Sequence, residues 1–214
     1  TPEPLELQKH LANAAASGMG YVVMEASSQA LKYHRTLGVR FAAAVFLNIG
    51  TDHISPIEHP DLDDYLRSKL KIFAQAELSC VNLDCDCGEE ALRTAQNACE
   101  RVIGFSRRDP TADVYGHDVR KWGDDILFQV EAGELSGRYR LTMPGLFNVE
   151  NALAAIAVCL GLGIPQQAVQ AGLEAVKTRD GALNAFITVT GERALDRAEH
   201  IQAGAKTAEG PLYG

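Results

Sequence analysis

The sequence predicts an α/β protein, with a mainly parallel sheet flanked by helices and a small antiparallel β meander. Short apolar runs alternate with stretches in which apolar residues recur every three or four positions, which is the pattern of buried parallel strands joined by helices. Further along the chain, apolar residues recur at every second position, as in an antiparallel sheet with one buried face. Two more helical stretches follow.

The parallel part is expected between residues 4 and 106. Its first helix should end at Gly18, because glycine readily adopts the backbone conformation that ends a helix. Each predicted strand is a short, uninterrupted apolar run. In chain order we expect a helix over 4–18, strands over 21–26 and 41–50, a helix from Asp61 to about residue 73, a strand over 78–84, a helix over 87–100 and a strand over 101–106.

The antiparallel part should follow directly. Residues 112–119, 125–132 and 137–143 alternate with period two and are separated by glycine and aspartate turns. The stretch 147–163 then has helical spacing and ends at a glycine. A last helix over 165–176 opens on proline, a residue favoured in the first turn.

Composition excludes several classes of function. The chain of 214 residues carries a net charge of -8, which argues against nucleic-acid or anionic-membrane partners. It has no apolar run of the roughly 18 residues that a membrane span needs, and no basic segment or apolar signal region at its start, so we expect a cytoplasmic protein. Five scattered cysteines indicate reduced thiols, and the close pair Cys85 and Cys87 has no second pair at zinc-ligand spacing.

Polar residues follow two predicted strands at the edge where α/β sheets collect ligands. Glu25, Ser27 and Ser28 end the first apolar run, and Asn48 is followed by residues 51–53, which read Thr-Asp-His. These side chains are candidates for a binding site. The alternative is that Ser27, Thr51 and Asp52 cap helices or form turns.

Lys69 interrupts the apolar face of the helix that begins near residue 61. Burial lowers a lysine pKa from about 10.4 and favours the neutral amine, which reacts with carbon dioxide to give an anionic carbamate. A carbamylated Lys69 and Glu25 would then offer oxygen ligands to magnesium. Alternatively, Lys69 extends to the edge of the apolar face or pairs with an acid. The other residues of this face are Leu62, Tyr65, Leu66, Leu70, Ile72 and Phe73.

Four ordered motifs resemble the central domain of the Mur ligases, most closely the muramyl tripeptide synthetase branch. They are MEASSQALKYHR at 24–35, NIGTDHI at 48–54, DYLRSKLKIF at 64–73 and MPGLFNVENALAAI at 143–156. The resemblance covers residues 1 to about 177. It implies a P-loop NTPase-like fold and a role in peptidoglycan synthesis. The activity it implies is ATP-dependent addition of a diamino acid to UDP-N-acetylmuramoyl-L-alanyl-D-glutamate (UDP-MurNAc-dipeptide below) through an acyl phosphate.

The resemblance also implies roles for individual residues. Lys69 would be carbamylated, and with Glu25 and His53 it would form the catalytic magnesium site; because imidazole suits softer metals, manganese could replace magnesium there. In place of the glutamine that the family often has two residues before the site arginine, this chain has Tyr33. Thr1, Ser27 and Arg35 would contact the UDP-MurNAc-dipeptide, and Asn148 and Asn151 would lie near the adenine of ATP.

Two features depart from the family pattern. The phosphate-binding GxxGK[ST] motif is absent, and so is the third domain, so we expect a fragment that is inactive alone. Residues 178–214 form an atypical tail in place of the hinge and the C-terminal domain. Because a back-translation of TRDGALNAF, read two bases later, gives Pro-Gly-Arg as in the family hinge, we hypothesise a frameshift near Thr178.

Three other readings are consistent with the residues. The chain could be a non-catalytic module that binds UDP-sugar peptides. It could also be a ligase of the cyanophycin or folylpolyglutamate synthetase type. A metal-dependent hydrolase built on Glu25, Asp52 and His53 is the third reading, although the further His and Asp ligands usual in two-metal hydrolases are missing.

Overall fold

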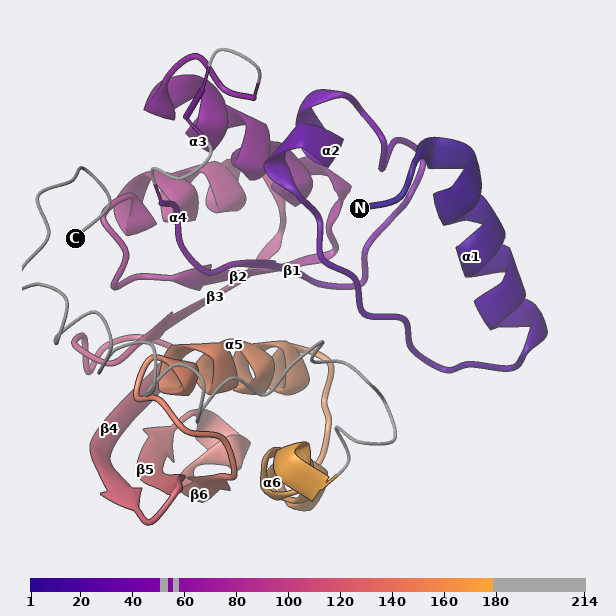
Figure 1. Ribbon diagram of the computed structural model, residues 1–214. Helices are drawn as coiled ribbons and strands as arrows, with labels where there is room; N and C mark the ends of the chain where they lie inside the picture. The colour runs from indigo at the N-terminus through magenta and orange to yellow at the C-terminus, as the bar shows by residue number, and fades with distance from the viewer. Residues whose placement is uncertain (51–53, 56–57, 179–214) are drawn as a thin grey trace, which may run out of the picture.

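The computed structural model describes residues 1–50, 54–55 and 58–178 and shows a sheet covered by helices on both faces (Figure 1). The predicted His53 and the tail from residue 179 lie outside these described residues. One mixed sheet of six strands runs in the order β1-β2-β3-β4-β5-β6. The strands are β1 (Ala44–Phe46), β2 (Leu78–Asn82), β3 (Arg101–Ser106), β4 (Val114–Trp122), β5 (Asp125–Glu131) and β6 (Gly137–Leu141).

The sheet confirms the predicted fold class. The pairs β1–β2, β2–β3 and β3–β4 are parallel, and the pairs β4–β5 and β5–β6 are antiparallel. The meander is not a separate sheet, because Phe105 and Ser106 at the end of β3 pair with Val114 and Tyr115 at the start of β4. The junction therefore continues one hydrogen-bonded sheet from the parallel part into the antiparallel part.

Helices form where apolar residues recur at helical spacing, and glycines end two of them as predicted. Gly18 and Gly163 follow α1 and α5 with φ of +72° and +68°, a left-handed conformation that glycine adopts without steric cost. Two short 3-10 helices, η1 (Lys71–Gln75) and η2 (Gly133–Leu135), complete the fold. The α-helices are α1 (Pro4–Ala16), α2 (Ser28–Lys32), α3 (Leu62–Leu70), α4 (Gly88–Ala98), α5 (Asn148–Gly161) and α6 (Gln166–Glu174).

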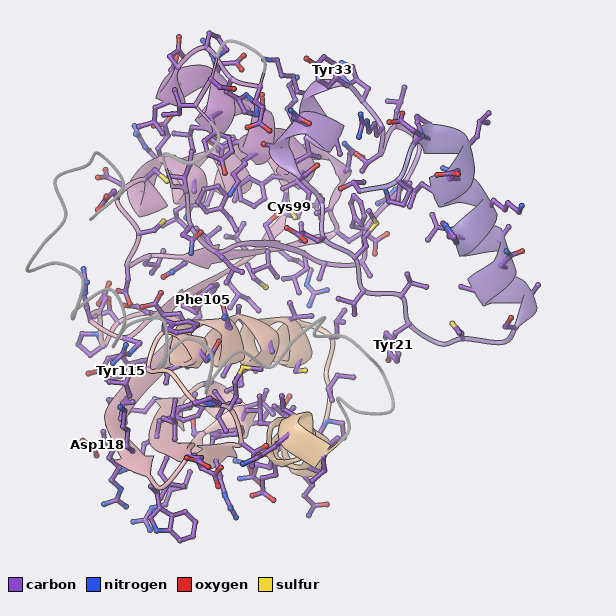
Figure 2. The ribbon with its side chains drawn as sticks, viewed as in Figure 1. Tyr21, Tyr33, Cys99, Phe105, Tyr115 and Asp118 are labelled. Atoms are coloured by element: carbon purple, nitrogen blue, oxygen red, sulfur yellow. The ribbon has the colours of Figure 1, made fainter. Side chains whose placement is uncertain are left out.

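The core lies in two layers, one on each face of the sheet. Helix α5 packs against one face, where Leu153 and Ile156 are fully buried in a cluster with residues of β2 to β6. On the other face, α3, η1 and α4 bury a smaller cluster that includes Leu66, Phe73 and Ala91. Figure 2 shows Phe105 of β3 between the sheet and α5. The two layers hold the parallel strands and position their carboxyl ends.

The predicted buried strand at 21–26 is wrong. In the structure this segment has no strand partner among the described residues, and Tyr21, Val22 and Val23 are 73%, 52% and 97% exposed. Tyr21 lies at the periphery of the molecule in Figure 2. An apolar run becomes a strand only where a neighbouring strand pairs with its backbone and another layer covers its side chains. The residues of the run alone provide neither the neighbouring strand nor the covering layer.

The helix that carries Lys69 is partly as predicted. Tyr65, Leu66, Leu70 and Phe73 are buried, which confirms the apolar face. Leu62 is 46% exposed, so its predicted place in the buried face is wrong. Leu62 is the first residue of α3. Regular α-helix also ends at Leu70 and continues as the 3-10 helix η1.

Candidate functional site

Lys69 reaches from α3 to the carboxyl end of β1. Its side chain is half-buried, and Nζ donates a hydrogen bond to the backbone carbonyl of Asn48 at 2.8 Å. Nζ also lies 5.0 Å from the ring centroid of Tyr65 and 5.9 Å from that of Phe46. These contacts accommodate a lysine at the boundary between the apolar face and the strand end. They favour the alternative that Lys69 extends to the edge of the face, and carbamylation stays a prediction.

Thr1, Glu25 and Ser27 meet at the start of α2. Thr1 Oγ1 donates to the carbonyl of Glu25 at 2.8 Å and accepts a hydrogen bond from the backbone N–H of Ser27 at 2.9 Å. Ser27 Oγ accepts from the N–H of Ala30 at 3.2 Å, so Ser27 caps α2, as one interpretation of the sequence held. The Glu25 residue is exposed. The structure thus brings together three predicted site residues through the hydroxyl of Thr1, the carbonyl of Glu25 and the backbone N–H of Ser27.

Arg35 lies just after α2 and forms an ion pair. Its Nη2 is 2.8 Å from Glu3 Oε1, and the two side chains are 28% and 64% exposed. The backbone N–H of Arg35 donates to the carbonyl of Ala30 at 2.8 Å, which holds this residue against α2. An anionic ligand at this guanidinium would compete with an exposed glutamate, whose pairing in water contributes little free energy.

Asn148 and Asn151 lie in the first turn of α5, on the same side of it. Asn151 Nδ2 donates to Asn148 Oδ1 at 3.0 Å, and Asn148 Nδ2 donates to the carbonyl of Pro144 at 2.7 Å. The N-cap position of α5 is Phe147, and no side chain caps the helix there. Asn148 is buried while Asn151 is exposed, so the outer amide is the one that a ligand could reach.

A further polar group at the ends of β2 and β3 was missed from the sequence. The Asp84 carboxylate accepts from Ser106 Oγ at 2.5 Å and from the backbone N–H of Arg107 at 2.6 Å. Arg107 Nη1 lies 4.0 Å from Glu150 Oε1, which joins this group to the start of α5. The rule that selected Glu25 applies here too, because Asp84 and Ser106 directly follow apolar runs.

A buried histidine joins α2 to α3 and was also missed. His59 is fully buried, and Nδ1 lies 2.6 Å from Asp64 Oδ2 while Nε2 lies 2.9 Å from Ser28 Oγ. Lys32 Nζ is 2.6 Å from the same Asp64 oxygen. The hydrogen bonds from Lys32 and from His59 lower the pKa of the Asp64 carboxyl below its usual value. The spacing of these four residues in the sequence does not predict the contact, because they come from α2, α3 and the segment before α3.

Asp64 should therefore make the free energy of unfolding depend on pH in the acidic range. A carboxyl with a lowered folded-state pKa stabilises the fold above its unfolded pKa of about 3.9, and this contribution is lost as pH falls through the folded value. We expect the free energy of unfolding to fall less steeply below pH of about 4 in Asp64→Asn than in the wild type. Urea unfolding at several acidic pH values measures this slope. The control is Asp63→Asn on the exposed side of α3, and an equal change of slope in both variants would contradict the assignment.

The cysteines do not add a recognisable metal centre to the described part of the chain. All five thiols are free, and the Sγ atoms of Cys85 and Cys87 are 3.9 Å apart. Burial, reinforced by the neighbouring Cys87, raises the pKa of Cys85 to about 12. Within the described ranges, three or more His, Cys, Asp or Glu side chains are nowhere grouped to hold a metal ion, and none of the helices there could cross a membrane.

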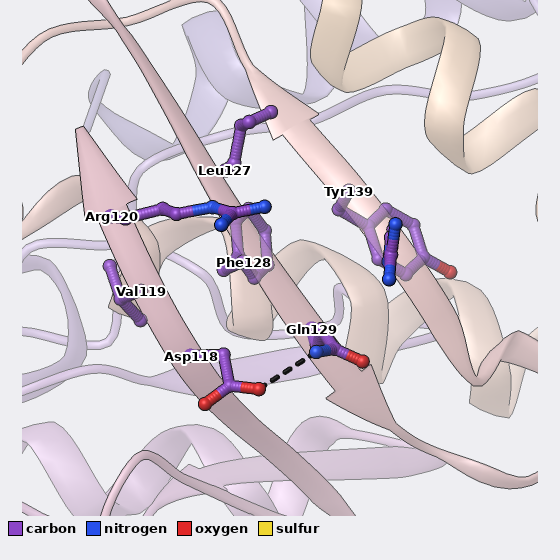
Figure 3. Close-up of a pocket in the computed structure, with 8 residues that line it drawn as sticks. Asp118, Val119, Arg120, Leu127, Phe128, Gln129 and Tyr139 are labelled. Carbon is purple, nitrogen blue, oxygen red and sulfur yellow. Dashed lines mark hydrogen bonds between the residues drawn. The ribbon is translucent and has the colours of Figure 1, made fainter. Parts of the chain in front are cut away.

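A groove of about 500 Å³ lies on the β4–β5–β6 face, away from these residues (Figure 3). Asp118 accepts a hydrogen bond from Gln129 at 2.7 Å, drawn as the dashed line in Figure 3. Arg120 and Arg138 on its rim are exposed. None of the predicted site residues that the structure describes lines this groove. The groove and the residues that the sequence predicts for the site therefore lie in different parts of the molecule. The lining residues are Asp118, Val119, Arg120, Leu127, Phe128, Gln129, Arg138 and Tyr139.

Comparison with known proteins shows which protein family the chain comes from. The family described as the Mur ligase middle domain matches residues 1–159. The chain belongs to the Mur ligase family. This confirms the resemblance seen in the four sequence motifs, and the match includes every predicted site residue.

Individual relatives point to one branch of the Mur ligases. The chain is 37% identical over 179 residues to UDP-N-acetylmuramoyl-L-alanyl-D-glutamate–L-lysine ligase of Streptococcus mutans, covering 81% of this chain and 34% of that protein. It is 38% identical over 168 residues to UDP-N-acetylmuramyl-tripeptide synthetase of Bifidobacterium longum, covering 77% of this chain and 32% of that protein. This Mur ligase chain therefore spans about a third of these curated relatives.

The fold agrees with a solved Mur ligase structure. A UDP-N-acetylmuramoyl-L-alanyl-D-glutamate–2,6-diaminopimelate ligase superposes with a TM-score of 0.74 at 28% identity, over 81% of this chain and 36% of that chain. The relatives named for lysine and the structure named for diaminopimelate act on the same nucleotide dipeptide, according to their names.

Proposed function

We propose that this chain is the central domain of an ATP-dependent ligase that adds a diamino acid to UDP-MurNAc-dipeptide in peptidoglycan synthesis. The match to the Mur ligase middle domain over residues 1–159 carries the proposal, supported by relatives whose names specify this nucleotide dipeptide. The proposed domain spans residues 1–177. Residues 178–214 remain, as a hypothesis, an atypical tail produced by a frameshift.

The proposed reaction needs charge neutralisation and positioning. A substrate carboxylate oxygen attacks the γ-phosphorus of ATP, ADP leaves, and an acyl phosphate results. The amine of the diamino acid then attacks the acyl carbon, a tetrahedral intermediate forms, phosphate leaves and the amine loses a proton. Phosphoryl transfer depends on holding the reactants in line and offsetting negative charge. The carboxyl ends of β1, β2 and β3 supply polar groups suited to both tasks.

Lys69, Glu25 and His53 are the residues that we propose for a magnesium site. A carboxylate and a carbamate are oxygen donors, which fit magnesium, and the ion would neutralise phosphate charge. In carbamylation the neutral Lys69 nitrogen attacks the carbon of carbon dioxide, an N–C bond forms and one N–H proton leaves to solvent. The product retains one N–H, which can still donate to the carbonyl of Asn48, the present partner of Nζ. The observed contact therefore suits both states of Lys69.

Thr1, Ser27 and Arg35 are proposed to bind the UDP-MurNAc-dipeptide, and Asn148 and Asn151 to bind the adenine of ATP. Arg35 has the geometry to grip a carboxylate or phosphate with two parallel hydrogen bonds. Its place just after α2, where its backbone N–H donates to the carbonyl of Ala30, holds it against the short helix that Ser27 caps. The acidic groups of the nucleotide dipeptide are the ligands that this arrangement fits.

Calorimetric titration with UDP-MurNAc-dipeptide tests the proposed function. We expect the wild-type chain to bind, and Arg35→Ala to bind about tenfold to a hundredfold more weakly, the effect of losing a charged hydrogen bond. The matched control is Arg93→Ala, which removes an exposed arginine from α4 and should leave the affinity unchanged. Absence of binding by the wild type, or equal affinities in the two variants, would contradict the assignment.

A further inference from the structure

His59 is held on both sides of its ring inside the protein. The side chain is fully buried, stacks on Tyr65 with ring centroids 4.9 Å apart, and has a hydrogen-bond partner at each nitrogen. The carboxylate of Asp64 can only accept, so Nδ1 carries a hydrogen and donates to it. Nε2 is then paired with the hydroxyl of Ser28. Both polar atoms of a buried ring are satisfied, which is the condition under which burial stabilises rather than costs free energy.

A hydrolytic triad has the same hydrogen-bonded series of serine, histidine and aspartate. The distances from His59 Nε2 to Ser28 Oγ, 2.9 Å, and from His59 Nδ1 to Asp64 Oδ2, 2.6 Å, would suit such a triad. The surroundings of these three residues do not suit a hydrolytic triad. Ser28 is 6% exposed and lies in the first turn of α2 against α3, and the groove of Figure 3 lies on the β4–β5–β6 face instead. Lys32 also binds the aspartate at 2.6 Å and neutralises it. The network therefore serves packing between helices rather than nucleophilic attack.

The network joins α2, which lies between the proposed site residues Ser27 and Arg35, to α3, which carries Lys69. Ser28 is the residue next to the cap Ser27, which touches Thr1, and the same short helix leads to Arg35. Asp64 lies in α3, whose later residue Lys69 reaches β1. Lys32 strengthens the link, because its Nζ also donates to the carbonyl of Glu58 at 3.0 Å. The helices α2 and α3 thus approach each other through hydrogen bonds to one buried ring.

We propose that His59 is a positioning residue that fixes α2 relative to α3, and so places the substrate-binding residues Ser27 and Arg35 relative to Lys69. The proposal rests on the proposed function for the identity of the ligand, but the positioning itself concerns the unliganded protein. Without the ring, Ser28 Oγ and the Asp64 carboxylate lose their shared partner, and the helices can separate or slide. Positions that must hold within a fraction of an ångström for phosphoryl transfer would then be lost.

The test uses the full chain and two variants of the network, His59→Gln and Ser28→Ala. Glutamine can retain the contact at the position of Nε2 but not the one to Asp64, and alanine removes only the hydroxyl that meets the ring. Ser79→Ala is the matched control, because Ser79 is also fully buried but its hydroxyl has no hydrogen-bond partner in the described structure. All variants are compared at a temperature at which circular dichroism shows them folded.

Two readouts separate positioning from general stability. In the unliganded chain, amide hydrogen exchange should accelerate about tenfold or more in α2 and α3 of both network variants, and stay unchanged there in Ser79→Ala. The affinity for UDP-MurNAc-dipeptide should fall about fivefold to tenfold in Ser28→Ala, more in His59→Gln, and less than twofold in the control. Exchange in α2 and α3 equal to that of the control in both network variants would overturn the proposal. If the wild type itself fails to bind, the proposed function fails, and the exchange experiment still decides the role of His59.

Discussion

Replacing Lys69 with arginine is expected to abolish a carbamate signal that the wild-type chain shows in ¹³C-labelled bicarbonate. Arginine retains the positive charge and the donor to Asn48, but its guanidinium stays protonated and offers no neutral amine to carbon dioxide. Carbon NMR detects the carbamate directly. We also expect the affinity for magnesium in the same bicarbonate buffer to fall about tenfold or more, because two oxygen ligands are lost.

Lys71→Arg is the control for this experiment. Lys71 is exposed at the start of η1, two residues from Lys69, and its replacement should leave the carbamate signal in place. A signal that survives Lys69→Arg, or that disappears with Lys71→Arg, would show that the modified amine is another one. A wild-type chain without any carbamate signal would leave Lys69 as the cation that its contacts with Asn48, Tyr65 and Phe46 already accommodate.

Replacing Phe105 with alanine is expected to lower the free energy of unfolding by about 3–5 kcal/mol, the usual cost of removing a buried phenylalanine ring. Phe105 is fully buried in β3, at the point where the parallel part of the sheet continues into β4. The loss combines the removed apolar contact with the cavity left between the sheet and α5. Urea unfolding followed by circular dichroism measures it.

Phe147→Ala provides the comparison, since Phe147 precedes α5 and is 69% exposed. It should change the free energy of unfolding by less than about 0.5 kcal/mol, as surface substitutions usually do. Equal losses in Phe105→Ala and Phe147→Ala would mean that the layer between β3 and α5 does not stabilise the fold as the buried areas indicate.

Sequence patterns predicted the fold well wherever the structure depends on a local period. The strands β2 and β3 and the antiparallel strands β5 and β6 lie within the predicted runs, because alternation and apolar runs directly reflect which faces are buried. Strand β4 begins within its predicted run but continues three residues beyond it, to Trp122. The segment at 21–26 failed for the opposite reason. Its strand character requires a partner, and partners are a property of the whole sheet rather than of the segment.

The candidate site was predictable to the extent that it follows strand ends. Lys69 stands out as a cation on an apolar face, and its contact with Asn48 places it at a strand end, as the sequence suggested. Asp84 and Ser106 could have been found by the same reasoning. The pairing of His59 with Ser28 and Asp64 could not, because it depends on how two helices and a connecting segment approach in space.

The most direct test of this account is to map where the nucleotide dipeptide binds. Amide chemical shifts of the ¹⁵N-labelled chain, recorded during titration with UDP-MurNAc-dipeptide, locate the contact residue by residue. We predict that the largest changes occur from Ser27 to Ala30 and at Arg35, around the cap of α2. Changes confined to the groove on the β4–β5–β6 face, at residues such as Asp118 and Arg138, would contradict the account.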